Sequence, residues 1–290
     1  MQTQNMQHKR VLAIHDLCAY GRCSLTAVVP ILSAMGVQAC PFPTAVFSNN
    51  FTYGSFVFSD FTERMPGFLE QWEKLGLAFD AVYSGFLSTV EQMEIVRRAA
   101  RRYGRKSGAA SSLVVIDPAM GDEGKLYPTF TEEMVRQMRR LVEEADLMTP
   151  NFTEARLLLG EDPMAPAPSA GELQAMCRSL SRLGARQVVI TSVPTQEGRI
   201  KVASFDAGRD AYAERETVRI PFFACGTGDA FTSVVTGAML RGQTLESAVA
   251  LAMTFVSYAI EQTVKAGTDA RAGILLEPCL SRLLAAGSNA

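Results

Sequence analysis

Short apolar runs alternate with amphipathic segments along most of the chain. An unbroken run of roughly four to eight apolar residues predicts a buried strand, whereas apolar residues at every third or fourth position predict a helix facing a core. By these rules the strands cover residues 11–15, 79–83, 113–116, 145–149 and 187–191. The helices cover residues 25–35, 88–103, 131–144, 152–159 and 171–183. Because strands and helices alternate, we expect a mostly parallel sheet with helices on both faces.

Three N-terminal segments interrupt this regular alternation. Residues 16–24 are predicted to be a connecting loop, in which Ser24 caps the following helix. Residues 37–41 and 44–47 are predicted as strand pieces broken by two prolines. Residues 48–60 are aromatic and polar without a helical period, which indicates an exposed flap near a ligand.

The C-terminal part of the chain follows a different pattern. Residues 200–205 and 211–220 alternate between apolar and polar positions as antiparallel strands do, and two or three helices follow them. The sequence Gly226-Thr227-Gly228-Asp229 lies between the second of these strands and the first of these helices. It directly precedes the small and apolar residues 230–240. A glycine turn that leads into a helix favours an anion, because the first N–H groups of the helix are unpaired. Asp229 would then lie beside the anion, where it is a candidate base; a plain helix cap is the structural alternative.

Composition and charge limit the classes of function. The chain has 290 residues, of which 48% are hydrophobic and 20% charged, and a net charge of −2, so we expect no nucleic-acid or membrane partner. Six scattered cysteines without a C-x-x-C pair, and only two histidines, argue against a zinc cluster and favour a reduced, cytoplasmic location. The most apolar long run, residues 248–260, is too short to cross a bilayer.

No linker or internal repeat divides the chain. The first ten residues are polar and lack the apolar segment of a signal peptide, so we predict a disordered tail over residues 1–10 and one domain over residues 11–290. One basic run, residues 97–106, resembles a nucleic-acid patch. Since it falls at the end of a predicted helix, where cations complement the helix dipole, a solvated helix end is the better interpretation.

Polar residues follow several of the predicted strands. In a sheet of this kind ligands gather at the carboxyl ends of the strands. One edge would therefore hold carboxylates, an amide, two hydroxyl groups and the glycine turn. The residues concerned, besides the turn itself, are Asp16, Asp117, Asn151, Glu154, Thr191 and Ser192. Each has a plain structural explanation alone, but together they form the inventory of a Mg²⁺-dependent phosphoryl-transfer site without a P-loop.

The same segments resemble the pyridoxal/pyridoxamine kinase branch of the ribokinase-like superfamily. The similar segments are VVIDPAMGDEGKLY at 114–127, TPNFTEA at 149–155, ITS at 190–192 and CGTGDAF at 225–231. The N-terminal stretch at 21–50 and DAVYSGFLSTVEQ at 80–92 are similar to that branch as well. The resemblance covers nearly the whole chain in the right order. It implies a ribokinase-like three-layer α/β/α sandwich with a mostly parallel central sheet.

The resemblance also implies a role for each matched residue. Asp229 would be the catalytic base, and the N–H groups of Gly226, Thr227 and Gly228 would form an anion hole. Asp117 and Glu154 would lie near Mg²⁺, partly through water. ATP would contact Asn151, Thr191, Ser192 and Tyr127, and the resemblance leaves a monovalent-cation requirement open.

The departures from the family pattern fall in the substrate pocket, for which the resemblance indicates Asp16, Ser48, Asn50 and Phe86. Asp16 stands where many members have Ser, and Phe86 replaces the common Tyr. In the F-S-N-H-T segment the usual His and Thr are Asn50 and Phe51. Because an anionic Asp16 could pair with a protonated amine or ring nitrogen, we hypothesise a preference for pyridoxamine or a shifted substrate.

The sequence thus predicts an ATP- and Mg²⁺-dependent kinase that phosphorylates the hydroxymethyl group of a B6 vitamer in pyridoxal phosphate salvage. Two alternatives stay open. One is the same chemistry on the thiamine precursor 4-amino-5-hydroxymethyl-2-methylpyrimidine, and the other is a vitamer- or nucleotide-binding protein without turnover. The resemblance further implies a homodimer.

Overall fold

The computed structural model describes residues 8–104, 112–195, 198–222 and 224–285. The predicted disordered tail falls mostly on residues 1–7, which lie outside the described residues, and the first strand begins at Arg10. In the described part of the chain no helix is long and apolar enough to span a bilayer. All six cysteines are free thiols.

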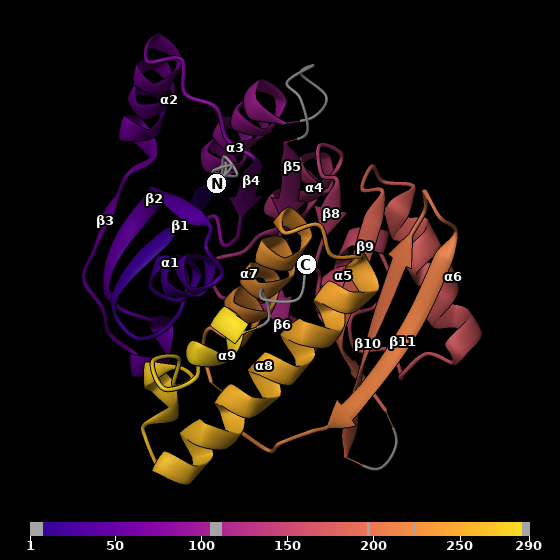
Figure 1. The fold of residues 1–290 in the computed structure, drawn as a ribbon. Coiled ribbons are helices and arrows are strands. Elements are labelled where there is room, and N and C mark those ends of the chain that lie inside the picture. The colour runs from indigo at the N-terminus through magenta and orange to yellow at the C-terminus, as the bar shows by residue number, and fades with distance from the viewer. Residues whose placement is uncertain (1–7, 105–111, 196–197, 223, 286–290) are drawn as a thin grey trace, which may run out of the picture.

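A nine-stranded sheet forms the middle layer of the molecule (Figure 1). In spatial order it runs β11-β10-β9-β8-β5-β4-β1-β2-β3, and the six strands from β9 to β2 are parallel. β10, β11 and β3 are antiparallel to their neighbours, as the alternating pattern predicts for residues 200–220. The strands are β1 (Arg10–Tyr20), β2 (Gln38–Asn49), β3 (Phe58–Asp60), β4 (Ala81–Ser84), β5 (Leu113–Ile116), β8 (Leu147–Met148), β9 (Gln187–Pro194), β10 (Arg199–Asp206) and β11 (Ala211–Val218).

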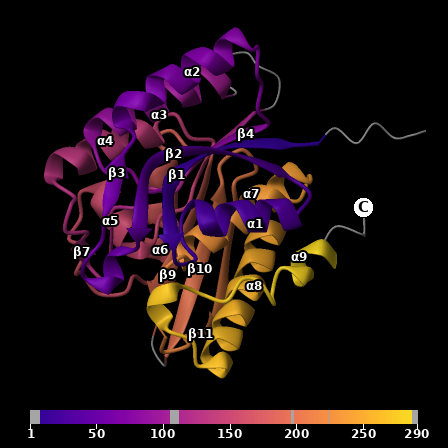
Figure 2. The same ribbon diagram turned by 90° about the vertical axis from the view of Figure 1, so that its left-hand side faces the viewer.

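Helices cover both faces of this sheet (Figure 2). One face packs against α2 to α6, and the other against α1, α7, α8 and α9. The helices are α1 (Leu25–Ala34), α2 (Met65–Lys74), α3 (Val90–Tyr103), α4 (Glu132–Val142), α5 (Phe152–Leu159), α6 (Ala170–Ser181), α7 (Thr227–Leu240), α8 (Leu245–Ala266) and α9 (Ser281–Ala285). The predicted three-layer α/β/α sandwich with a mostly parallel central sheet is therefore confirmed.

Neighbouring residues of one strand pack into different hydrophobic cores, one on each face of the sheet. Ile14 and Val82 face the core under α2 to α6, whereas Ala13 and Tyr83 face the core under α1 and α7. Successive side chains of a strand point to opposite faces, so a strand buried on both sides must be apolar throughout. This is why the parallel strands appear in the sequence as unbroken apolar runs.

Two N-terminal predictions are wrong. Residues 16–20 are not a loop but the second half of β1, which continues past a register shift at Asp16 because it pairs with β2 up to Tyr20. β2 is also continuous through Pro41 and Pro43. The prolines are tolerated because β3 pairs only with residues 45–47, so the first half of β2 has one neighbouring strand and needs no second row of hydrogen bonds.

The other elements follow the predicted segments to within a few residues. α2 is an addition, since no element was expected between residues 61 and 78. The flap over residues 48–60 contains the 3-10 helix η1 (Phe51–Tyr53) and the exposed strand β3. Two more 3-10 helices are η2 (Thr62–Arg64) and η4 (Ala270–Ala272), and a small hairpin joins β6 (Gly121–Asp122) to β7 (Lys125–Leu126).

Candidate active site

The candidate site lies at the carboxyl ends of the parallel strands, the lower edge of the sheet in Figure 1. α7 begins at this edge directly after Gly226, whose φ angle is 83°. A Cβ atom on Gly226 would lie 1.9 Å from the carbonyl oxygen of Arg22, so only glycine fits. The first N–H groups of a helix have no acceptor within the helix, and an anion can therefore bind here.

Asp229 lies in the first turn of α7, as predicted. One of its carboxylate oxygens, Oδ2, accepts a hydrogen bond of 2.8 Å from the backbone N–H of Ser24. The other, Oδ1, lies 3.8 Å from Nδ1 of His15. Burial raises the pKa of Asp229, and the Ser24 hydrogen bond opposes that rise. One oxygen is thus fixed by the protein, while Oδ1 accepts no hydrogen bond from the described residues.

Ser24 connects two carboxylates. Its backbone is in the left-handed region at a φ of 50°, which is strained for a residue with a side chain. Its N–H donates to Asp229, and its hydroxyl donates to Oδ1 of Asp16 at 2.6 Å. The prediction that the Ser24 side chain caps α1 is wrong, because its hydroxyl makes no cap hydrogen bond and is committed to Asp16.

His15 is part of the site, although the sequence placed it in the first strand without a role. Its side chain is fully buried, its ring packs edge-on against Tyr83 at 4.4 Å, and neither ring nitrogen has a hydrogen-bond partner among the described residues. Burial lowers its pKa to about 3, so the ring is neutral and does not form an ion pair with Asp229. Gly85 makes room for the ring, since a Cβ there would lie 2.3 Å from Nδ1 of His15.

Asp16 lies at the register shift of β1, where the chain leaves the regular pairing with β2. Burial raises its pKa to about 7, and the charge of Asp229 adds to the rise, while the Ser24 hydroxyl opposes it. Near neutral pH this carboxyl group is therefore partly protonated. A cationic ligand would favour its ionised form.

Asp117 follows β5 and faces the start of α7. Its Oδ2 accepts a hydrogen bond of 3.3 Å from the hydroxyl of Thr232 on α7, which is itself 2.9 Å from the hydroxyl of Thr149. Burial, followed by the charge of Asp229, raises the pKa of Asp117 to about 8. A Cβ on Gly228 would lie 3.9 Å from Oδ2 of Asp117, so the missing side chain keeps the space before this carboxylate open.

Asn151 and Glu154 form a capping box at the start of α5. Each side chain accepts a hydrogen bond from the backbone N–H of the other residue. The amide group of Asn151 also donates to the carbonyl of Gly121, and Glu154 accepts from the N–H of Met120. Burial and the nearby Asp117 raise the pKa of Glu154. Both side chains thus hold the β6–β7 hairpin to α5, which leaves them little freedom to reach a ligand directly.

The acidic residues fit a divalent cation only in part. Within residues 8–104, 112–195, 198–222 and 224–285, no three His, Cys, Asp or Glu side chains converge as a ready-made metal centre. Asp117 has an oxygen, Oδ1, that accepts no hydrogen bond from the described residues, whereas both oxygens of Glu154 are occupied. Mg²⁺ keeps several waters and shares its shell with phosphate oxygens, so Asp117 could be one ligand and Glu154 an outer partner through water.

The residues predicted to contact a nucleotide or a ring lie on neighbouring elements. Thr191 forms a β-bridge to Asn151, and its N–H donates to the carbonyl of Pro150. Ser192 beside it is exposed, with a φ of 56°. The ring of Tyr127 lies 6.3 Å from that of Phe86, so these two predicted site residues are close together.

Phe86 joins the flap to the rest of the site. Its ring lies 6.0 Å from Phe51 of the flap and 6.1 Å from Phe130. The flap residues Ser48 and Asn50 are hydrogen-bonded within the protein: the Ser48 hydroxyl accepts from the N–H of Val57, and the Asn50 amide donates to the carbonyl of Arg271. No local sequence pattern predicts this second bond, which joins residues 221 positions apart.

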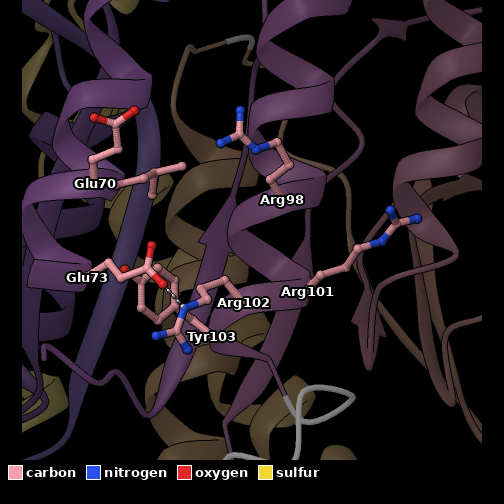
Figure 3. Close-up of a pocket in the computed structure, with 7 residues that line it drawn as sticks. Glu70, Glu73, Arg98, Arg101, Arg102 and Tyr103 are labelled. Carbon is pink, nitrogen blue, oxygen red and sulfur yellow. Dashed lines mark hydrogen bonds and ion pairs between the residues drawn. The ribbon is translucent and has the colours of Figure 1, made fainter.

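A groove lies between α2 and α3 (Figure 3), two helices near the edge of the sheet opposite the candidate site (Figure 1). It has a volume of about 380 Å³, and among its lining residues are Glu73, Arg101 and Arg102. Arg102 pairs with Glu73, Arg101 pairs with Glu144 and Arg97 pairs with Glu94. These ion pairs support the interpretation of the basic run as a helix end, as far as Gly104; its last two residues lie outside the described residues.

The chain is similar to known proteins along most of its length. The family model described as phosphomethylpyrimidine kinase matches residues 25–273. The pyridoxal kinase PdxY of Rubrobacter xylanophilus is 30% identical over 273 residues, which cover 89% of this chain and 88% of that protein.

Two solved structures are similar throughout. A protein from Bacteroides thetaiotaomicron, described as a phosphomethylpyrimidine kinase, is 41% identical, with a TM-score of 0.91 over 97% of this chain and 96% of that one. A second crystal form of that protein was solved with pyridoxal and has a TM-score of 0.90. Pyridoxal kinase from Lactobacillus plantarum is 30% identical, with a TM-score of 0.86 over 96% of this chain and 97% of that one.

The raised pKa of Asp117 makes stability depend on pH. Folded Asp117 keeps its proton up to a pKa of about 8, whereas the unfolded chain releases it near 3.8, so stability falls as the pH rises between these values. In the absence of divalent cations, Asp117→Asn should therefore raise the Tm more at about pH 8.5 than at about pH 5. Calorimetry measures this, with Glu91→Gln on the exposed surface of α3 as the control for removing one carboxylate. A Tm difference that is the same at both pH values would contradict it.

Proposed function

The chain belongs to the phosphomethylpyrimidine kinase family, and we propose that it transfers the γ-phosphoryl group of ATP to the hydroxymethyl group of a vitamin B6 vitamer. One observation carries the proposal: a half-buried carboxylate, Asp229, lies beside the open first turn of α7, with one oxygen fixed and the other without a hydrogen bond from the described residues. The pyridoxal kinases among its relatives support the choice of substrate.

Asp229 is the general base of the proposed reaction. Its Oδ1 would accept the proton of the hydroxymethyl group as that oxygen attacks the γ-phosphorus. An ordinary carboxylate is sufficient if the transition state is loose, because the proton can leave late. The raised pKa of Asp229 makes it a better proton acceptor than an exposed aspartate.

The start of α7 would hold the phosphoryl group during transfer. The N–H groups of Gly226, Thr227 and Gly228 are directed along the helix axis at its positive end, where negative charge is favoured. Since Gly226 and Gly228 have no side chains, a phosphate can approach the backbone closely.

The nucleotide would lie along the strands next to α7. We assign Asn151, Thr191, Ser192 and Tyr127 to ATP, with Asn151 acting mainly through the hairpin that it anchors. Mg²⁺ would be held by Asp117 and, through water, by Glu154, and it would supply positive charge to the phosphate oxygens. Burial raises the pKa of both carboxyl groups, and a nearby negative charge adds to each rise, that of Asp229 for Asp117 and that of Asp117 for Glu154, so a cation here would favour their ionised forms.

The vitamer ring would lie between Asp16 and the aromatic residues around Phe86. Asp16 is buried close to Asp229, so it can contact a polar group of the ring while Asp229 reaches the hydroxymethyl group. Ser48 and Asn50 would act through the flap, whose shape their hydrogen bonds fix, because their polar atoms already bond to the protein.

A hydroxymethylpyrimidine is the second candidate substrate. The matching family model is described as phosphomethylpyrimidine kinase, which points to a pyrimidine ring, and a hydroxymethylpyrimidine presents the same hydroxymethyl group and a ring nitrogen. A binding protein without turnover is the third candidate. The arrangement of Asp229 and the start of α7 favours catalysis over binding alone, because a binding site has no need of a carboxylate with a raised pKa and a free oxygen beside an anion site.

A homodimer is the proposed assembly. β3 ends the sheet, and its residues Phe58, Ser59 and Asp60 are exposed. Val57 and Phe58 are exposed by 77% and 53%, so this edge offers both unpaired backbone groups and apolar side chains to a second copy.

Replacing Asp229 tests the proposed reaction. Asp229→Asn keeps an oxygen for the Ser24 N–H but cannot accept a proton, so we expect kcat to fall by roughly 10²- to 10⁴-fold while the KM for ATP changes little. ADP release with Mg²⁺ and ATP is measured separately with pyridoxal, pyridoxine, pyridoxamine and the hydroxymethylpyrimidine. Asp162→Asn on an exposed loop is the control.

Each outcome of that assay has a meaning. Turnover of a B6 vitamer that is lost in Asp229→Asn supports the proposal. Turnover of the pyrimidine alone would assign the protein to thiamine supply by the same chemistry. Binding of vitamers or ATP without turnover of any of the four would contradict an enzymatic function.

Replacing Asp16 tests the substrate preference. If Asp16 pairs with a charged amine, Asp16→Ser should reduce kcat/KM for pyridoxamine by about tenfold or more relative to pyridoxine. In the parent protein, the KM for pyridoxamine should fall as the pH rises through about 7, because Asp16 ionises there. An unchanged order of preference among the vitamers in Asp16→Ser would refute the pairing.

A further inference from the structure

The connection between α8 and α9 packs directly against the catalytic edge. In Figure 1 it is the yellow segment below α1. Its backbone receives two hydrogen bonds from the N-terminal part of the chain: Ala272 accepts from the N–H of Arg22 at 2.9 Å, and Arg271 accepts from the Asn50 amide at 2.7 Å. The side chain of Arg22 also pairs with Glu277 at 2.9 Å.

Two glycines enclose the carbonyl group of Arg22. A Cβ on Gly226 would lie 1.9 Å from that oxygen, and a Cβ on Gly273 would lie 2.8 Å from it. Both glycines have left-handed backbones, with φ angles of 83° and 82°. The Arg22 peptide is therefore held between the start of α7 and the α8–α9 connection, and neither glycine can gain a side chain without displacing it.

The α8–α9 connection is itself firmly anchored. Ile274 and Leu276 are buried in the core under α1, α7 and α8. The N–H of Leu275 donates to the hydroxyl of Thr263 on α8 at 2.8 Å. Because the core and this hydrogen bond hold the α8–α9 connection in place, a side chain at position 273 would displace the Arg22 peptide rather than the connection.

The position of Arg22 determines that of Ser24, two residues further on. Ser24 is the residue with the strained backbone, and its N–H is the donor that fixes Oδ2 of Asp229. A displaced Arg22 peptide would turn this N–H away from the carboxylate. We infer that Gly273, which touches neither Asp229 nor the anion-binding turn of Gly226, is a positioning residue for the catalytic base through the Arg22–Ser24 backbone.

Gly273→Ala tests this inference, which rests on the proposed kinase function for its kinetic readout. We expect kcat to fall by about tenfold to a hundredfold, since small displacements of a base have effects of that size, while the KM values for ATP and vitamer stay within about twofold. The control is Gly267→Ala at the end of α8. Gly267 also has a left-handed backbone, with a φ of 62°, but no atom within 4 Å of its Cβ position, so kcat should be unchanged.

A double-mutant cycle separates positioning from general damage. If Gly273 acts through Asp229, adding Gly273→Ala to Asp229→Asn should change the remaining kcat by less than about twofold. The same loss of kcat in both backgrounds would overturn the inference. Glu277→Gln, which weakens the exposed ion pair with Arg22, is the milder variant if Gly273→Ala fails to fold; its smaller loss of kcat should likewise vanish in the Asp229→Asn background.

A measurement without turnover distinguishes failure of the inference from failure of the proposed function. The amide proton of Ser24 donates to a carboxylate, so its NMR resonance should move upfield in Gly273→Ala and not in Gly267→Ala. An unchanged Ser24 resonance in Gly273→Ala would overturn the inference, whatever the protein phosphorylates.

Discussion

The hydrogen bond from the Ser24 backbone to Asp229 connects the two halves of the site. It joins residues 205 positions apart, one in the turn before α1 and one in the first turn of α7. It fixes one oxygen of a half-buried carboxylate and leaves the other for chemistry, and it lowers a pKa that desolvation raises. The strained backbone of Ser24 and the close approach of Arg22 to two glycines both lie on the segment that carries this donor.

Negative charge is concentrated around that hydrogen bond. Asp16, Asp117 and Glu154 are all buried near Asp229 or near one another, and burial raises the pKa of each. The neutral His15 offsets none of this charge. Such a site is complete only with cationic partners, which a magnesium ion and a protonated vitamer would provide. The electrostatics therefore favour a function in which two cations arrive with the substrates.

Local sequence patterns predicted much of the fold and part of the candidate site. The parallel strands are apolar on both faces, and the Gly-Thr-Gly-Asp turn followed by a small-residue helix defines the start of α7 without tertiary information. Asp117 could be found because it directly follows an apolar strand, and Asn151 because it lies close after the next one. The fold and the candidate base could thus be predicted from the sequence.

Contacts between segments that are far apart in the chain could not be predicted from the sequence. β1 was predicted to end near His15 because the polar residues after it look like a loop, yet pairing with β2 extends it to Tyr20. Ser24 was predicted as a helix cap, but Asp16 takes its hydroxyl. The environment of His15 depends on Gly85, and the Arg22 peptide on Gly273; no local pattern indicates either pair.

In the proposed reaction Oδ1 of Asp229 is the atom that receives the substrate's proton. A crystal structure with a B6 vitamer and a non-hydrolysable ATP analogue would show whether it can. We expect the hydroxymethyl oxygen to lie within hydrogen-bond distance of Oδ1, about 2.6–3.2 Å, while Oδ2 stays on the Ser24 N–H. A hydroxymethyl group directed toward a different carboxylate, with Asp229 out of reach, would contradict it.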